Sequence, residues 1–240
     1  MVEVLRLLRD GDGYTDLADV SAAGARALSV DGLAVSLVTE AGTAELVCCS
    51  DPSTRRFEDL QVTLGEGPGP DAVRTGALVW VPDLATVRAQ RWPALAMEAP
   101  DLSARAVFCF PMAIGAIKVG VLTAVRRTPG PLTAQHADDA LVLASALTAH
   151  CLGSGPQRPP LGAVAADPPH TLQHAVIHQA TGMLSVQLAL PLADALLRLR
   201  AHAYSSGRSI TDICQDVVDR RLRLDPGAAG TPPAVVEEKD

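Results

Sequence analysis

Residues 172–224 constrain the fold most, because their apolar side chains recur at helical spacing in three consecutive blocks. The second block follows Pro191, whose fixed φ and missing N–H suit the first turn of a helix. Gly207 is predicted to end that helix in the left-handed conformation, and Ser209 is predicted to cap the third helix. Helices this short cannot bury an apolar stripe alone, so we expect them to pack as a three-helix bundle.

The charge of this region differs in sign from that of the chain as a whole. The whole chain carries a formal charge of −7 and has a pI near 5.3, which argues against nucleic-acid binding over its entire surface. Residues 172–224, however, contain six arginines against four aspartates. This excess fits either a local surface for a polyanion or ordinary solvated helix faces.

The run Val-Ile-His-Gln-Ala-Thr-Gly-Met-Leu at residues 176–184, followed by residues 195–200 and 209–218, resembles an ANTAR domain. The family pattern is Arg-x-x-Ile-x-x-Ala-Lys-Gly-x-Leu on the first helix and Ala-x-x-x-Leu-Arg on the second. His174 stands where the family commonly has Arg, and Thr181 where it commonly has Lys. The matching residues are Ile177, Ala180, Gly182, Leu184, Leu196 or Leu199, and Arg200.

The resemblance implies a three-helix RNA-binding module of bacterial transcription antiterminators. Such a module binds paired hairpin loops in nascent transcripts and prevents the terminator from forming. Two loops are held best by two bundles, because linking two weak contacts raises the effective concentration of the second. We therefore expect a homodimer, formed through the first and last helices of the preceding domain.

The resemblance also suggests which side chains contact RNA. If Val176, Met183 and Val186 face the bundle interior, as we predict, the opposite strip of the first helix is exposed, and Ala180 and Gly182 permit close helix crossing. We then expect base-edge contacts from Gln179, Thr181 and Ser185, phosphate contacts from Arg198, Arg200 and Arg208, and base stacking by Tyr204. Two alternatives stay open: Arg200 as a structural salt-bridge residue, and Tyr204 as a cap on the bundle.

Residues 16–152 mix short strands with helices joined by short loops, which predicts an α+β domain on an antiparallel sheet with flanking helices. Before it we place an extension at 1–15. After it we place a Pro/Gly-rich linker at 153–169, the bundle at 170–224 and a disordered tail at 225–240. Residues 64–70, with three glycines and two prolines, are expected to join two helices; a phosphate cradle is the alternative.

This order of elements resembles a GAF domain. The matching segments are Gln61 to Pro68, Trp80 to Asp83, Trp92-Pro93, Pro111 and the strand that begins at Gly120. The resemblance implies a sensor for a small-molecule or protein signal, with Ser36, Phe108 and Phe110 as candidate pocket-lining residues for an unidentified small ligand. Packing in the core is the alternative for each of these residues. Together the two resemblances indicate a transcription antitermination regulator with GAF and ANTAR domains, of the actinobacterial type.

No catalytic constellation and no metal-ligand spacing emerge from the sequence, so we expect neither an enzyme nor a cofactor. The five cysteines are odd in number and scattered, which favours free thiols in a reducing cytosol. No signal peptide or membrane span is evident, and a cytoplasmic protein is expected.

Two other functions remain as alternatives. One is a DNA-binding regulator with a helix-turn-helix around residues 205–208, although Asp212, Asp216 and Asp219 would repel DNA phosphates. The other is a redox enzyme of the GAF type, in which Cys109 would join Cys48 or Cys49.

Overall fold

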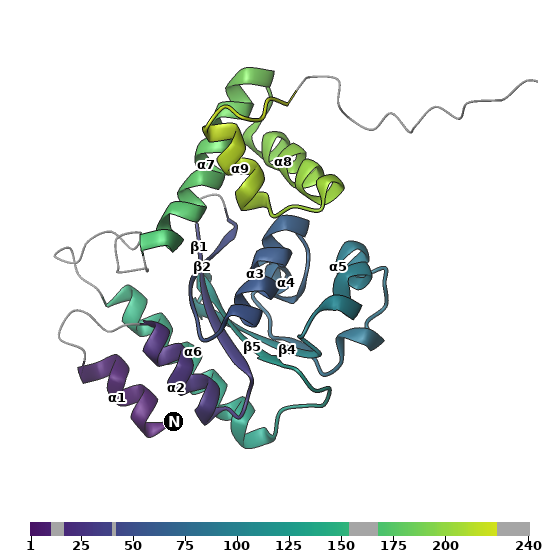
Figure 1. Ribbon diagram of the computed structural model, residues 1–240. Helices are drawn as coiled ribbons and strands as arrows, with labels where there is room; N and C mark the ends of the chain where they lie inside the picture. The colour runs from purple at the N-terminus through teal and green to yellow at the C-terminus, as the bar shows by residue number, and fades with distance from the viewer. Residues whose placement is uncertain (11–16, 40–41, 154–167, 225–240) are drawn as a thin grey trace, which may run out of the picture. The chain divides into compact units, whose positions relative to one another are not determined.

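The computed structural model describes residues 1–10, 17–39, 42–153 and 168–224, which form two compact units (Figure 1). The first unit extends from Met1 to Leu172 and the second from Gln173 to Asp240. Residues 11–15, most of the predicted linker and the predicted tail lie outside the described residues. Residues 168 and 169, the last two of the predicted linker, belong to a helix that begins at Pro168.

The first unit contains a five-stranded antiparallel sheet with the strand order β2-β1-β5-β4-β3. Helices α1, α2 and α6 lie on one side of this sheet, and α3, α4 and α5 lie on the other (Figure 1). The strands are β1 (Gly32–Val38), β2 (Ala44–Cys49), β3 (Val79–Val81), β4 (Ala106–Ile114) and β5 (Ile117–Arg126). The helices are α1 (Val2–Asp10), α2 (Leu17–Ala27), α3 (Pro52–Leu64), α4 (Pro68–Thr75), α5 (Pro93–Glu98) and α6 (Ala134–Leu152), with short 3₁₀ turns at Leu84–Thr86 and Ala99–Asp101.

Side chains alternate along the strands, so each strand contributes to two separate cores. Leu33, Val35 and Leu37 of β1 pack toward α2 and α6. On β4, Val107 and Cys109 belong instead to the core beneath α3, α4 and α5, together with Phe57 and Trp92. A sheet covered on both faces explains why its strands are nearly continuous apolar runs.

The Gly/Pro-rich segment at residues 64–70 joins α3 to α4, as expected. Gly65 ends α3 in the left-handed conformation at φ 71°, and Pro68 begins α4. The side-chain oxygen of Gln61 accepts a hydrogen bond of 2.8 Å from the N–H of Gly69. Gly67 lies so close to the Gln61 side chain, at φ 137°, that a β-carbon there would overlap it. The glycines therefore allow a tight connection between two helices.

Two carboxylates from this connection and from α4 hold the segment that contains α5. Glu66 accepts hydrogen bonds of 2.6 and 2.9 Å from the N–H groups of Ala94 and Leu95, in the first turn of α5. Asp71 accepts a bond of 3.3 Å from the indole N–H of Trp92 and a second from Arg91. The helices α3, α4 and α5 are thus linked by hydrogen bonds as well as by apolar packing.

The helices of the second unit are α7 (Pro168–Leu188), which enters it at Gln173, α8 (Leu192–Ser206) and α9 (Ile210–Val218). Gly207 ends α8 at φ 63°, and the hydroxyl of Ser209 accepts a 3.1 Å bond from the N–H of Asp212. Both predicted helix ends are confirmed. Ala195, Leu199 and Ala203 of α8 are fully buried, and so is Ile213 of α9.

Candidate nucleic-acid interface

The buried face of α7 differs from the predicted one. Ile177, Ala180 and Leu184 are buried at helical spacing, whereas Val186 is 86% exposed. Val176 and Met183 are only partly buried. The prediction that Val176, Met183 and Val186 face inward is therefore wrong. Both sets of residues recur at helical spacing, and packing against other helices decides between them.

Thr181 lies on the buried face and is 7% exposed, so its predicted place on the exposed strip is wrong. Its hydroxyl donates a 2.7 Å hydrogen bond to the carbonyl oxygen of Ile177, one turn earlier. A threonine satisfied by the backbone of its own helix can be buried without an unpaired polar group. Ser185 is half-buried, and its hydroxyl donates a 2.6 Å bond to the carbonyl oxygen of Leu190. Both hydroxyls therefore support the local fold.

The outer strip of α7 holds Ala175, Gln179, Gly182 and Val186, which follow one another at steps of four, three and four residues. Gln179 is exposed, as predicted. A β-carbon on Gly182 would meet no atom within 4 Å, so this glycine does not serve a close helix crossing, contrary to the expectation. None of these four residues on the outer strip of α7 carries a charge.

Arg198 and Arg200 leave α8 on opposite flanks, because two residues correspond to a rotation of about 200° around a helix. Both are half-buried beside the core residue Leu199. Burial lowers the pKa of the Arg200 guanidinium from its usual value. Arg200 shares its flank with Leu197, which is 63% exposed, and Tyr204, which is 44% exposed. Leu197, Arg200 and Tyr204 thus form one strip of α8, which presents a cation and an aromatic ring at helical spacing.

Arg208 belongs to a group of paired charges at α9. Its guanidinium lies 2.7 Å from the carboxylate of Asp216, which also accepts a 2.8 Å bond from Arg221. Arg221 in turn lies 2.8 Å from Asp219. The hydrogen bond from Arg208, followed by that from Arg221, lowers the pKa of Asp216.

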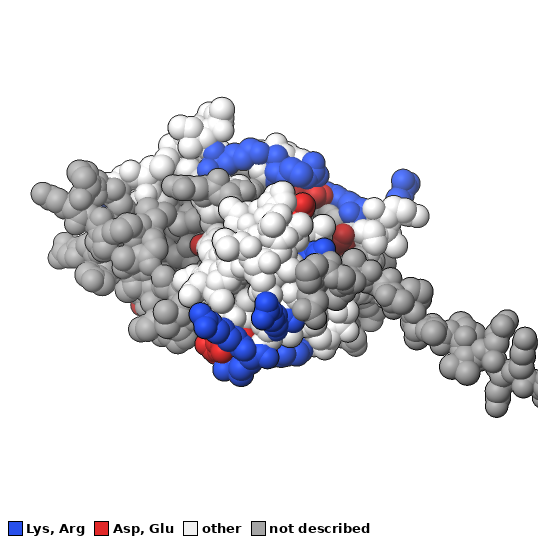
Figure 2. All heavy atoms as spheres, turned by 90° about the horizontal axis from the view of Figure 1, so that it is seen from above, with Lys and Arg blue, Asp and Glu red and all other residues white. Residues whose placement is uncertain are grey.

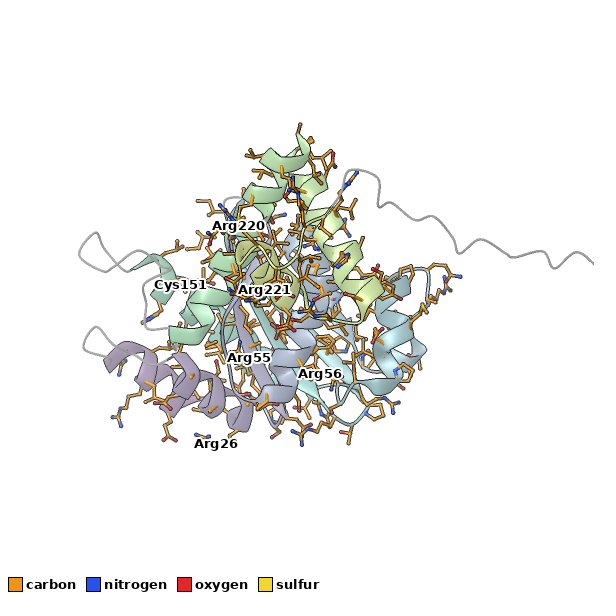
Figure 3. The ribbon with its side chains drawn as sticks, turned by 45° about the horizontal axis from the view of Figure 1, so that its top comes forward. Arg26, Arg55, Arg56, Cys151, Arg220 and Arg221 are labelled. Carbon is orange, nitrogen blue, oxygen red and sulfur yellow. The ribbon has the colours of Figure 1, made fainter. Side chains whose placement is uncertain are left out.

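Three arginines that follow α9 are not among the predicted RNA contacts. Arg220, Arg221 and Arg223 are all exposed there, and Arg220 and Arg221 lie next to each other in Figure 3. The Arg-Arg-Leu-Arg run itself is the signal that could have included them. In the view from above, Arg and Lys side chains form separate patches, and Asp and Glu side chains lie beside them (Figure 2).

In the first unit, the three predicted ligand-lining residues do not converge. Phe108 and Phe110 are fully buried in the core toward α2 and α6. Ser36 follows Val35 along β1 and therefore faces the α3 side of the sheet. Ser36 is 1% exposed and the two phenylalanines are 0% exposed, so all three are packed residues. They lie on opposite faces of the sheet, and the expectation that they line one pocket is therefore wrong.

The cysteines proposed for redox chemistry are also separated. Cys48 packs in the core toward α2, 3.1 Å from the hydroxyl of Ser21, while Cys109 faces α4. Cys48 is on β2 and Cys109 is on β4, and strands β1 and β5 lie between these two strands. At the usual strand spacing, β2 and β4 are therefore about 14 Å apart. A disulfide needs α-carbons within about 7 Å. The redox alternative, with Cys48 or Cys49, therefore lacks the geometry it requires.

Residues 172–218 match the model of the ANTAR domain family. This interval spans most of α7, all of α8 and all of α9. By this match, residues 172–218 are an ANTAR domain. No curated protein sequence is significantly similar to the chain.

Among solved structures, the GAF domain of a phosphoenolpyruvate-protein phosphotransferase from Coxiella burnetii is similar to the first unit. It has 14% sequence identity and a TM-score of 0.50, over 63% of this chain and 92% of that chain. A GAF domain from an Acinetobacter phosphoenolpyruvate-protein phosphotransferase has 15% identity, a TM-score of 0.43, and coverage of 64% and 95%. Free methionine-R-sulfoxide reductase from Neisseria meningitidis has 17% identity, a TM-score of 0.43, and coverage of 62% and 84%. The similarity to the Coxiella burnetii domain shows that the first unit has the GAF fold, which the sequence predicted.

Among the described residues, no group of three or more His, Cys, Asp or Glu side chains could hold a metal ion. None of the described helices is by itself long and apolar enough to cross a membrane. The two helical segments 175–188 and 192–206, bent by 109°, pass that test together by length and composition.

Proposed function

We propose that this chain is a transcription antitermination regulator, in which the ANTAR domain binds hairpin loops of nascent RNA and the GAF-fold domain controls it. The observation that carries the proposal is the family match at residues 172–218, whose three helices form a compact unit. The pairing of a sensor-type fold with an ANTAR domain favours a regulator over an enzyme.

We place the RNA contacts on exposed or half-buried side chains of this domain. Tyr204 can stack an unpaired base, and Arg200 on the same flank of α8 can hold an adjacent phosphate. Gln179 offers an amide to base edges, and Arg208 adds a second cation. Arg198 lies on the other flank of α8 and would contact a different part of the RNA. Thr181 and Ser185, bonded to the backbone, would act through the shape of the domain.

The expected homodimer fits the surface of α6. Residues 140–152 contain no Asp, Glu, Lys or Arg, although α6 has an exposed face. Leu141, Val142 and Leu152 on this face are each between 47% and 49% exposed. An uncharged helix face of this kind is suited to pairing with its copy, which would bring two ANTAR domains onto one RNA.

The DNA-binding alternative is less well supported. Asp212 is exposed on α9, and Asp216 and Asp219 engage Arg208 and Arg221. A helix with acids along its length is unfavourable in the major groove, where phosphates lie on both sides.

The proposal is tested by titrating the full chain with a tandem-hairpin RNA, a single hairpin and duplex DNA at two salt concentrations. We expect preference for the tandem hairpin, and a loss of roughly tenfold or more for Tyr204→Ala, from one lost stacking contact. Arg200→Ala should weaken binding most at low salt. Arg26→Ala is the matched control, because Arg26 is an exposed arginine on α2 (Figure 3). Equal affinity for duplex DNA, or no effect of Tyr204→Ala, would contradict the proposal.

A further inference from the structure

Glu58 is a carboxylic acid inside the GAF-fold domain, on the inner face of α3. It is 5% exposed, whereas Arg55 and Arg56 on the same helix are more accessible (Figure 3). The groups nearest to it come from three elements: the hydroxyls of Thr123 on β5 and Ser36 on β1, and the amide of Gln61 on α3. Glu58 therefore lies between a helix and the centre of the sheet, where water has little access.

The polar atoms around this carboxyl are not fully paired. Glu58 Oε1, Ser36 Oγ and Gln61 Nε2 are buried and have no hydrogen-bond partner of good geometry. Gln61 uses its oxygen for the N–H of Gly69 and so has only its amide N–H groups left to offer. A charged carboxylate would need several good donors in such a place, but a neutral carboxylic acid needs fewer.

No cation neutralises Glu58 among the groups that act on it. In order of size, burial raises its pKa, the Thr123 hydroxyl lowers it, Asp59 raises it, and Ser36 and Gln61 lower it. The result is a pKa raised from 4.5 to about 7. Burial raises the pKa of the Cys109 thiol on β4, and the charges on Glu58 and on Asp71 of α4 raise it further. The other charged or titratable residues on the surrounding elements are Arg55 and Arg56 on α3, Arg74 on α4, Glu98 on α5, Glu45, Cys48 and Cys49 on β2, and Lys118 and Arg126 on β5.

We propose that Glu58 is a reversible proton-binding site, and that the proton it holds stabilises the α3–α4–α5 side of the GAF-fold domain. Removing the proton would place an unpaired charge beneath α3. The same helix carries Gln61, which bonds the start of α4, and it leads into Glu66, which bonds the start of α5. Loosening α3 would therefore weaken the hold on both other helices. The loosening of α3 would act as a signal if the GAF-fold domain controls the ANTAR domain, and this step rests on the function proposed above.

The direction of the pH effect follows from the raised pKa. The folded state keeps the proton up to a pH near 7, whereas the unfolded chain loses it near 4.5. The stabilisation is therefore fully present below pH 4.5, is lost as the pH rises through 7, and is absent at higher pH. Between pH 5 and pH 8 the unfolding equilibrium constant should rise by roughly 50- to 100-fold through this group alone.

The test uses the full chain and needs no RNA, so failure of RNA binding would not affect it. Unfolding by urea is measured from pH 5 to pH 8 for the wild type, for Glu58→Gln and for the control Glu3→Gln, an exposed glutamate on α1. We expect Glu58→Gln to remove the predicted change and Glu3→Gln to retain it. The same pH dependence in wild type and Glu58→Gln would overturn the proposal.

A second measurement does not depend on a stable variant. The side-chain carboxyl carbons of the eight glutamates are labelled with ¹³C and titrated by NMR in the wild-type protein. One resonance should have a midpoint near pH 7, and Ser36→Ala should move that midpoint upward, because the Ser36 hydroxyl lowers the Glu58 pKa. If all eight midpoints lie below about pH 5.5, in the usual range for glutamate, the site does not exist.

Discussion

At the scale of single residues, the type of a polar side chain in a helix does not show whether that side chain is buried or exposed. Thr181 follows Ala180 in the buried stripe of α7, and its hydroxyl is satisfied by the carbonyl oxygen of Ile177. A threonine can be buried in this way, because its methyl group packs and its hydroxyl bonds the preceding turn. The residue type alone therefore does not distinguish an exposed contact from a core position.

Thr181→Val should leave RNA affinity within about twofold of wild type. It should change stability by less than about 1 kcal/mol, because the Ile177 carbonyl oxygen that loses the hydroxyl lies within a helix, where it also accepts a backbone hydrogen bond. Thr181→Ala, which also removes the packed methyl group, should cost about 1 kcal/mol more. Urea denaturation and RNA titration measure the two effects. A tenfold loss of RNA affinity in a fully stable Thr181→Val protein would instead place Thr181 at the interface.

Asp216 restrains two arginines that could otherwise meet phosphates. Asp216→Ala should raise RNA affinity about 3- to 10-fold at low salt and steepen its salt dependence, because Arg208 and Arg221 lose their acidic partner. Asp194→Ala is the control, since it removes an exposed acid from α8 that is not part of this ion-pair group. Equal gains for both variants would mean that only net charge matters.

At the scale of elements, the sequence predicted the helices well and their faces poorly. Helix ends are set by local chemistry, such as the left-handed Gly207 and the Ser209 cap, and these were correct. The inward face of α7 was not, because small and apolar residues cover most of its circumference. Only the partner helices select one stripe among several of similar hydrophobicity.

Gly182 offers a test of the observed face. It lies inside α7 with open space where a β-carbon would be, so Gly182→Ala should stabilise the protein by about 0.5–1 kcal/mol. Chemical denaturation followed by circular dichroism would measure the change. Destabilisation would show that this position packs closely against a neighbour, as the sequence first suggested.

At the scale of the whole molecule, two units of different fold are joined through residues whose composition favours a linker. A sensor domain can bias an RNA-binding domain through such a connection if both act in pairs. The uncharged face of α6 is where we expect the pairing.

Val142→Glu combined with Ala149→Glu, an exposed position seven residues further along α6, should convert the proposed dimer to a monomer of 25.0 kDa, because two charges would be buried against two like charges. Sedimentation would follow the mass. Tandem-hairpin affinity should then fall by at least about tenfold while single-hairpin affinity is retained, since only avidity is lost. Met97→Glu on α5, at a position 71% exposed and not on α6, serves as the control. A wild-type protein that is already monomeric would exclude this interface.

The sequence by itself determined the order of elements, the positions of turns and caps, and the two fold types. These depend on local conformational preferences and on periodicity, which neighbouring residues encode. The tertiary structure alone decided which side of each element is buried. It placed Ser36 and Phe108 on opposite faces of one sheet, Thr181 inside the ANTAR domain, and Glu58 beneath α3 without a cation. Such contacts join residues far apart in the chain, and the packing of whole surfaces rather than any local pattern selects them.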